Sequence, residues 1–201
     1  MRLIRTVWNW EVAMWRSLYL WVRRKPRHPL AEGETPFAYD GIIAPVLYTF
    51  LVMSVIEIPI LDLLLKYALG WDEARGVLLI IGIWGVFWCL GLIASMKVHP
   101  HTVGPSGIRV RSGHGIDFPI PWEVVESVTK GIRSLEGNKT IQVDGDTLMV
   151  TAGSQTNVDV RLTTPTLLAP HHEPVTEVRL HADDAAGFVR AARARLGAPA
   201  L

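Results

Sequence analysis

Two carboxylates in this sequence stand where an ionisable group is rare. Glu57 and Asp62 interrupt a largely apolar run that extends from Ile42 to Leu65. If the run crosses a membrane, each carboxylate is costly and is expected to face water, a cation or a polar partner. Both are candidates for an intramembrane polar site, in which Glu57 would serve a proton- or ion-linked step or contact a cationic group of a partner. The alternative is that Glu57 lies near the lipid headgroups, with Pro59 loosening the helix there.

Small side chains in the segment 77–96 form a second group of candidates, because small residues at four-residue spacing let helices approach closely. They predict packing against the preceding apolar run, and homodimerisation is the alternative. The only cysteine of the chain belongs to this group and is expected to be a buried, inert thiol, without a disulfide or a cysteine-based zinc site. The candidates for helix packing are Gly82, Gly85, Cys89, Gly91 and Ser95.

Catalytic and metal-binding signatures are absent from the sequence. It has no GxSxG motif, no Walker-type phosphate loop and no HExxH motif. Its loop histidines lack acids or cysteines at ligand spacing, so we expect exposed histidines and no metal site. We therefore predict a protein that is not an enzyme, has no cofactor and has no evident small-molecule substrate. The histidines concerned are His99, His101, His171 and His172.

Four basic residues in the second half of the chain are candidates for contacts with lipid headgroups or with a partner. Arg109 and Arg111 are two apart in an alternating run, so on a strand they share a face. Lys130 and Arg133 complete the set. Residues 97–201 carry eleven basic and eleven acidic side chains. This balance disfavours nucleic-acid binding and leaves a solvated strand face as the alternative.

The elements that position these residues begin with two membrane-spanning helices. Val77–Met96 is twenty residues without a charge, and at about 1.5 Å per residue it matches the ~30 Å hydrocarbon core of a bilayer. A first helix from about 41 to 64 would cross in the other direction. The short loop 66–76 would join them into a hairpin. Asp62 and Lys66 are four residues apart and are expected to pair near the outer end.

The first 25 residues predict an amphipathic helix that lies in the headgroup layer. Trp8, Trp15 and Tyr19 lie near one helical face, whereas the other polar residues are mostly arginines. The alternative is that its tryptophans pack on a partner subunit. Residues 26–40, rich in proline and glycine, are expected to form a linker. The side chains of the helix expected to contact headgroups or a partner are Trp8, Trp15, Arg16, Arg23 and Arg24.

Basic residues also predict the orientation of the hairpin. Residues 1–28 carry seven Arg and Lys against one Glu, and Lys97 follows the second span. In the connecting loop, Lys66 and Arg75 are offset by two acids. Basic residues concentrate on the cytoplasmic side of membrane proteins. We therefore expect both termini in the cytoplasm, in a multi-pass protein of the inner or plasma membrane.

Beyond Met96 the sequence predicts a small β domain, 97–201, because glycines and prolines separate short β-rich runs. A C-terminal helix follows, capped by Asp183, with Phe188 facing inward and Gly197 as its stop. Seven strands closed by one helix would give every apolar face a partner. The expected strands are 107–111, 116–120, 122–129, 139–143, 147–151, 157–162 and 176–181.

Two stretches of this domain carry a resemblance to a known family. Residues 107–128, GIRVRSGHGIDFPIPWEVVESV, have a Gly-hydrophobic-Arg strand, a turn, an apolar strand and then Pro-Trp before a β-branched strand. Residues 176–196, TEVRLHADDAAGFVRAARARL, have a last strand and an Asp-capped helix. With its place after two membrane helices, the domain resembles the bacterial pleckstrin-homology (PH-like) domain. The resemblance implies a seven-stranded antiparallel sandwich or barrel with a capping helix, and a binding or scaffolding role.

Together these inferences predict an α+β membrane protein that is not an enzyme. It would present a cytoplasmic PH-like domain to a protein or lipid partner. Membrane lipids are expected partners, and a protein partner or self-association through the membrane helices is also expected. The alternative is an accessory subunit of a transporter or membrane enzyme, with Glu57 contributing to an intramembrane site.

Overall fold

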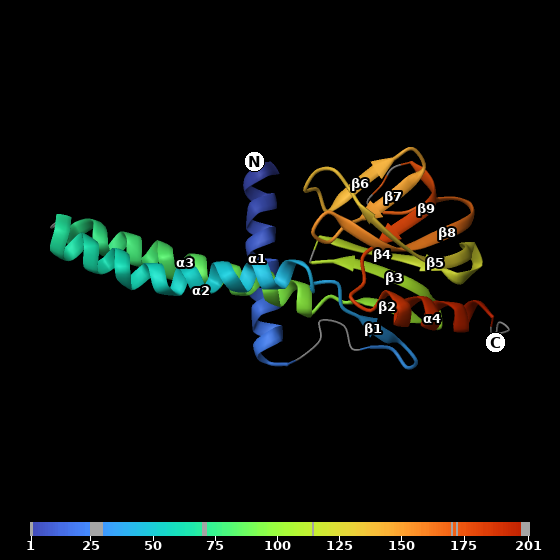
Figure 1. The fold of residues 1–201 in the computed structure, drawn as a ribbon, viewed down its shortest axis with the longest axis horizontal. Coiled ribbons are helices and arrows are strands. Elements are labelled where there is room, and N and C mark those ends of the chain that lie inside the picture. The colour runs from blue at the N-terminus through green and yellow to red at the C-terminus, as the bar shows by residue number, and fades with distance from the viewer. Residues whose placement is uncertain are drawn as a thin grey trace.

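The computed structural model describes residues 2–24, 30–69, 72–113, 115–169, 171 and 173–197. Among these residues the chain has an α+β fold with four α-helices and two β-sheets. A long helical hairpin projects from a β domain, and a further helix lies across the hairpin (Figure 1). The predicted α+β organisation with a hairpin and a β domain is confirmed.

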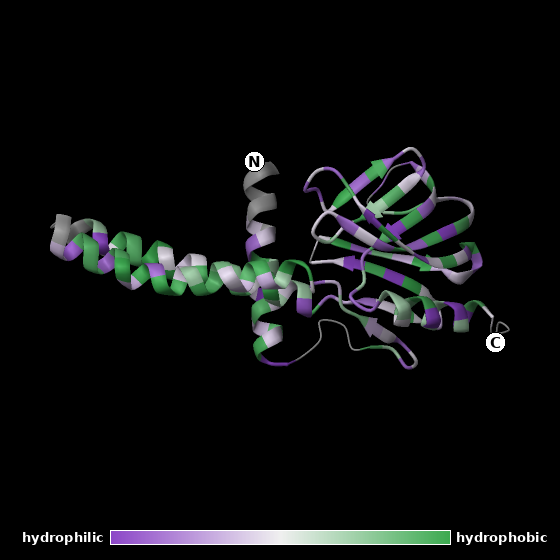
Figure 2. Cartoon of the chain, viewed as in Figure 1, coloured by the Kyte–Doolittle hydropathy of each residue, from purple (hydrophilic) through white to green (hydrophobic). Residues whose placement is uncertain are grey.

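The hairpin consists of α2, Ile43–Leu64, and α3, Asp72–Lys97, and a π-helical turn, Leu65–Leu69, extends α2. Both helices are long and apolar enough to cross a membrane. Only 6% and 17% of their most apolar stretches are buried inside the molecule, whereas the core helix of a soluble protein would be mostly covered. Figure 2 shows that hydrophobic residues, in green, occupy most of the hairpin. The helices leave a shorter connection than the predicted loop 66–76.

Helix α1, Arg2–Val22, runs across the hairpin close to the end that carries the β domain (Figure 1). It packs on α3, with Met14 and Ser17 buried. Its polar and apolar residues segregate strongly around the helix axis, as the sequence predicts. Several long side chains on its other faces are exposed, among them Trp8, Tyr19 and Val22.

The first sheet has four strands in the order β1-β2-β3-β4, and all neighbours are antiparallel. Strands β3 and β4 form a hairpin in which Ile108 is opposite Ile120 and Val110 is opposite Phe118. These apolar pairs point into the core because alternate residues of a strand share a face. The strands are β1 Thr35–Phe37, β2 His101–Gly104, β3 Gly107–Ser112 and β4 Ile116–Pro121.

The second sheet has five strands in the order β5-β8-β9-β7-β6. All of its neighbours are antiparallel except β7 and β9, which are parallel. A 3-10 turn, Trp122–Val124, leads into this sheet. The strands are β5 Val125–Ser134, β6 Ile141–Asp144, β7 Thr147–Val150, β8 Gln155–Leu167 and β9 Pro174–Leu180.

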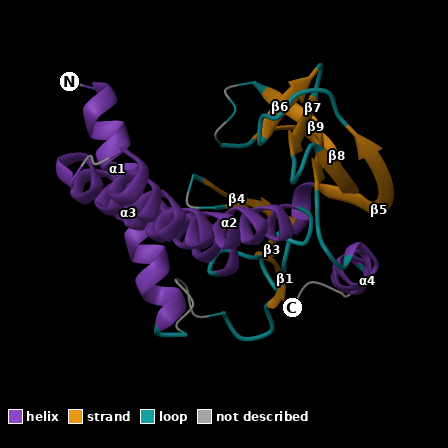
Figure 3. Ribbon diagram, turned by 60° about the vertical axis from the view of Figure 1, so that its left-hand side comes forward, coloured by secondary structure: helices purple, strands orange, loops and turns teal. Residues whose placement is uncertain are grey.

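One hydrophobic core lies between the two sheets and α4, Ala185–Leu196. Phe188 of α4 is fully buried and its ring meets that of Phe37 with centroids 5.0 Å apart. Figure 3 shows α4 beside the open side between the sheets. The helix therefore covers apolar edges that two twisted sheets leave exposed.

The N-cap of α4 corrects one expectation. The side chain of Asp184 accepts a hydrogen bond from the backbone N of Gly187 at 2.8 Å, so Asp184 is the N-cap and not Asp183. Asp183 instead accepts from the backbone N of Gly41, at the start of the hairpin. Asp184 therefore caps α4 and Asp183 binds the start of the hairpin, and the sequence pattern alone does not tell these two roles apart.

The expectation of seven antiparallel strands is also wrong in two respects. Each predicted strand is present, but the described residues hold nine strands, and the β7–β9 pair is parallel. The additional strands, β1 and β2, come before the first predicted one. Strand β1 lies in the segment expected to be a linker, whose residues 25–29 are outside the described part of the chain. Since β1 has three residues and β2 is buried throughout, neither shows the alternation that predicts a strand.

Candidate functional site

Direct bonds join the β domain to the start of the hairpin and the two hairpin helices to each other. At the start of α2, the backbone N of Gly41 donates to the carboxylate of Asp183 at 3.0 and 3.1 Å. At the end of α3, Lys97 Nζ lies 2.7 Å from Oδ2 of the buried Asp40. A backbone bond from Asp183 N to Ala38 O, 2.8 Å long, adds a third link. We call this region the joint, and it fixes the domain at one end of the hairpin.

Helix α1 completes the joint by crossing α3 closely. A Cβ atom on Gly91 would lie 2.5 Å from Met14 Cγ, so only glycine allows this approach. The rings of Trp15 and Phe87 are neighbours, with centroids 6.2 Å apart. Gly91 was expected to pack against the first span, but it packs against α1. The small side chain therefore positions the crossing helix and not the hairpin partner.

The face of α1 turned away from α3 carries aromatic and basic side chains. Trp8, Tyr19 and Val22 are exposed, and the Arg23 guanidinium lies over the Tyr19 ring at 5.1 Å. Trp15 is at the edge of this face and donates from Nε1 to Glu11 at 3.1 Å. Arg16 and Arg24 are also exposed. Such side chains on a helix that lies across the hairpin have the chemistry of a membrane-interface helix.

A second group of polar residues lies inside the hairpin, where α2 and α3 enclose a cavity of about 260 Å³. Arg75 of α3 donates to both carboxylate oxygens of Asp62, each at 3.0 Å. The predicted partner of Asp62 was Lys66, but Lys66 lies over the ring of Tyr67, 4.9 Å from its centroid. Asp62 pairs with Arg75 and not with Lys66 because a planar guanidinium forms two hydrogen bonds to a carboxylate, which an ammonium matches less well.

Glu57 lines the same cavity as Asp62 and Arg75. Its side chain is exposed, and among the described residues it forms no ion pair. The structure therefore brings both predicted carboxylates to one place, with Arg75 as a residue that the sequence reasoning missed. Local spacing gives no signal for Arg75, because its contact with Asp62 depends on the register between two helices.

The small residues of α3 divide between three neighbours. A Cβ on Gly82 would lie 2.8 Å from Ile58, whereas Gly85 has open space and borders the cavity. Cys89 Sγ donates to Leu47 O on α2 at 3.5 Å. Ser95 is buried at the joint, where its carbonyl oxygen lies 2.7 Å from His99 Nδ1. The group thus serves α2, α1 and the β domain in turn, along one helix.

The basic candidates of the β domain lie on two different sheets. On β3, Arg109 donates to Asp117 at 2.6 and 3.0 Å, and Arg111 Nε lies 3.5 Å from the same carboxylate. Burial alone would raise the pKa of Asp117, but the hydrogen bond and charge of Arg109 hold this pKa below its usual value. On β5, Lys130 is exposed and Arg133 pairs with Asp159 at 2.5 Å. Carboxylates therefore bond closely to Arg109 and Arg133, whereas Arg111 has Asp117 only at 3.5 Å.

Two histidines expected in exposed loops are buried. His99 and His101 are 4% and 1% exposed. His101 Nδ1 accepts from Arg111 N at 3.0 Å, so its Nε2 donates to His181 O at 3.0 Å. Burial lowers the pKa of His101 to about 4, which keeps the ring neutral. His171 is half-buried and His172 lies outside the described residues.

Comparisons with models of protein families, with curated proteins and with solved structures found no match for this chain. Within the described residues, no three His, Cys, Asp or Glu side chains gather into a group that could hold a metal ion. The arguments for function therefore rest on the arrangement of the hairpin, α1 and the β domain.

Proposed function

We propose that this chain is a membrane-anchored binding protein and not an enzyme. The hairpin crosses the cell membrane, α1 lies in the headgroup layer of the inner leaflet, and the β domain faces the cytoplasm. There the domain, which we propose to be PH-like, holds a protein or lipid partner close to the bilayer.

One observation carries this proposal: the apolar side chains of α2 and α3 point outward along the hairpin. Exposed apolar surface of this extent is unfavourable in water at about 25 cal/mol per Å², but it is favourable in lipid. The described part of the chain contains no element that covers it. The hydrocarbon core of a bilayer would remove all of these apolar side chains from water.

The joint supports the cytoplasmic-surface role of the domain. Asp183 of the domain accepts from Gly41 at the start of the hairpin, and Lys97 and Asp40 pair beside it. These bonds hold the domain close to the hairpin, unlike a domain on a free linker. Helix α1 lies across the hairpin at the same end (Figure 1). Its arginines support the proposal that this end is cytoplasmic, since basic residues concentrate on that side of membrane proteins.

Cysteine labelling tests the proposed topology. In a Cys89→Ala background, Ile132→Cys on β5 and Tyr67→Cys at the hairpin turn provide exposed reporters. A membrane-impermeant maleimide should label Ile132→Cys only in inside-out vesicles and Tyr67→Cys only in right-side-out vesicles. Labelling of both reporters from one side would show that the hairpin does not cross, and labelling of Ile132→Cys from outside would reverse the topology.

The hairpin cavity favours a second candidate function, an accessory subunit of a transporter or membrane enzyme. Its supporting observation is the meeting of Glu57, Asp62 and Arg75 in one cavity between the proposed spans. Glu57→Gln should then remove a partner that co-purifies in mild detergent, while membrane insertion is unchanged. Glu123→Gln, an exposed carboxylate of the β domain, is the control. Equal partner recovery from both variants would contradict a role for Glu57.

A further inference from the structure

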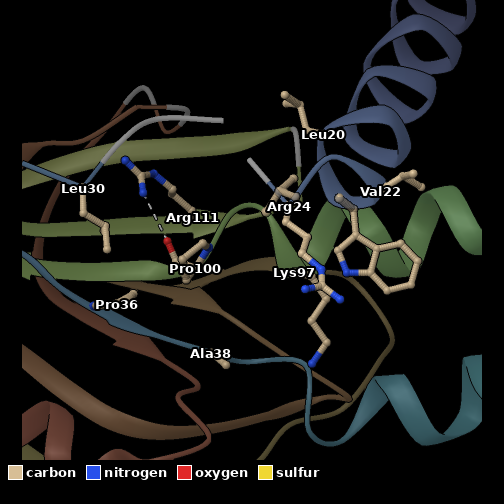
Figure 4. Close-up of a pocket in the computed structure, with 11 residues that line it drawn as sticks. Leu20, Val22, Arg24, Leu30, Pro36, Ala38, Lys97, Pro100 and Arg111 are labelled. Carbon is tan, nitrogen blue, oxygen red and sulfur yellow. Dashed lines mark hydrogen bonds between the residues drawn. The ribbon is translucent and has the colours of Figure 1, made fainter. Parts of the chain in front are cut away.

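A large cleft lies at the joint, between the end of α1 and the first sheet. Its volume is about 870 Å³, within the range of small-molecule sites. Figure 4 shows side chains entering it from α1, from the end of α3, from β3 and from the segment before α2. The described lining residues are Leu20, Trp21, Val22, Arg24, Leu30, Pro36, Ala38, Lys97, Val98, Pro100 and Arg111.

The charged groups of this cleft are all positive. Arg24, Lys97 and Arg111 line it, and no described lining residue is acidic. Lys97 is paired with Asp40, which is outside the lining. Arg24 is exposed and forms no ion pair within the described part of the chain. Arg24 therefore leaves unneutralised positive charge at the cleft, which favours an anion.

Arg111 provides an independent indication of a ligand. Its side chain is only 7% exposed, and its Nε is buried without a hydrogen-bond partner. The nearest carboxylate, Asp117, is 3.5 Å away, and Nη1 makes a long bond of 3.3 Å to Pro100 O. Buried guanidinium N–H groups are normally satisfied, and leaving one unpaired is costly. An anionic oxygen in the cleft would supply the missing acceptor.

The rest of the wall is apolar, and part of it comes from the helix that we place in the headgroup layer. Leu20, Trp21 and Val22 belong to the last turn of α1, and Val98 directly follows the end of α3. A ligand that fits both parts of the wall has an anionic head and a hydrocarbon body. A free phosphate would satisfy the arginines but leave the apolar wall in contact with water.

We propose that the cleft binds one anionic phospholipid of the leaflet in which α1 lies. The headgroup phosphate accepts from Arg24 and Arg111, and the upper part of the acyl chains lies against Leu20, Trp21 and Val22. This inference rests on the proposed membrane anchoring. It specifies the ligand class of the joint and explains why the chain places a basic cleft there.

Native mass spectrometry of the full chain in mild detergent tests the proposal. The protein is titrated with phosphatidylglycerol or with phosphatidylcholine, and bound lipid is counted on each molecule. We expect one phosphatidylglycerol to bind more tightly than phosphatidylcholine. Arg24→Gln should weaken phosphatidylglycerol binding about five-fold, since a cationic side chain near an anionic lipid contributes about 1 kcal/mol.

Two further variants separate the site from general charge. Arg190→Gln removes an exposed arginine of α4 that does not line the cleft, so its affinity should equal that of the wild type. Arg111→Lys keeps the charge but removes the Nε donor and the planar fork, and it should also weaken binding. Equal effects of Arg190→Gln and Arg24→Gln, or equal retention of the two lipids, would overturn the proposed site.

The anchoring and the lipid site can fail separately. Loss of anchoring would appear as a chain that does not float with liposomes of either lipid. Failure of the site alone would appear as normal flotation without selectivity for phosphatidylglycerol. Inorganic phosphate at equal concentration should not displace the bound lipid, and displacement would show that the cleft recognises a free anion.

Discussion

The hairpin and the β domain use the same apolar residue types in opposite ways. Phe50 of α2 is 64% exposed, whereas Phe188 of α4 is fully buried. Ile80 of α3 is 70% exposed, whereas Ile108 of β3 is 1% exposed. The domain removes its apolar side chains from water by packing them. Under the proposed anchoring, the hairpin does so by placing its apolar side chains in lipid.

The largest expected effect is the loss of Phe188 from the domain core. Phe188→Ala should lower the free energy of unfolding of the β domain by about 3–5 kcal/mol, because a buried aromatic side chain leaves a cavity. Phe50→Ala, the same change on the hairpin surface, should change it by less than about 0.5 kcal/mol. Hydrogen exchange of β8 and β9 amides in detergent measures both. Equal effects would remove the distinction between the two regions.

The next largest effect is a pH dependence of the stability of the β domain, which arises from His101. The pKa of His101 is about 4 when folded, against 6.5 for an ordinary histidine. The unfolded chain therefore binds the extra proton between these values, so stability is complete above pH 6.5 and falls as the pH drops toward 4. The loss is about 3 kcal/mol.

His101→Gln should remove most of this pH dependence, whereas His171→Gln should leave it intact. Burial also lowers the pKa of His181, whose carbonyl accepts from His101, so a smaller dependence of the same sign remains. Hydrogen exchange of β3 amides at several pH values, corrected for intrinsic rates, gives the profile. An unchanged profile in His101→Gln would contradict the assignment.

A lysine placed on the hairpin surface or on the β-domain surface tests whether each surface faces lipid or water. Ile80→Lys should oppose membrane insertion of α3 by about 2 kcal/mol, because a lysine in the hydrocarbon region is unfavourable. Ile132 on β5 is 72% exposed, much as Ile80 is, and Ile132→Lys should have no effect. The fraction of chain that resists carbonate extraction measures insertion. Equal extraction of both variants would place Ile80 in water.

The smallest expected effect separates the two neighbouring aspartates. Asp184→Ala removes the N-cap of α4 and should lower its stability by about 1 kcal/mol. Asp183→Ala should leave α4 intact and loosen the joint, which exposes the Gly41 amide. Hydrogen exchange of α4 and of the first turn of α2 distinguishes these results. If Asp183→Ala weakened α4 instead, the sequence-based assignment of the cap would be restored.

The sequence predicts those elements whose residues repeat with a clear period or composition. The charge-free Val77–Met96 predicts α3, and alternation in 157–162 predicts the centre of β8. Strand β1 is missed because three residues with Pro36 carry no period, and β2 because all four of its residues are buried. The parallel β7–β9 pair is missed because pairing between distant strands depends on the whole sheet.

The candidate site is predicted residue by residue but not in its contacts. Glu57 and Asp62 are found because a carboxylate in an apolar run is unusual. The bond from Arg75 to Asp62 requires the register of two helices, which local spacing does not provide. The burial of His101 is missed for the same reason, since its partner His181 is eighty residues away. Local patterns thus locate unusual residues, and tertiary packing decides what they touch.

Accessibility of spin labels to oxygen and to a water-soluble nickel complex tests the membrane location of the hairpin most directly. In full-length protein lacking Cys89 and reconstituted in vesicles, labels are attached at positions 80 and 132. The label at 80 should be relaxed by oxygen and shielded from nickel, and the label at 132 should show the reverse. A label at 80 that is as accessible to nickel as the label at 132 would contradict the account.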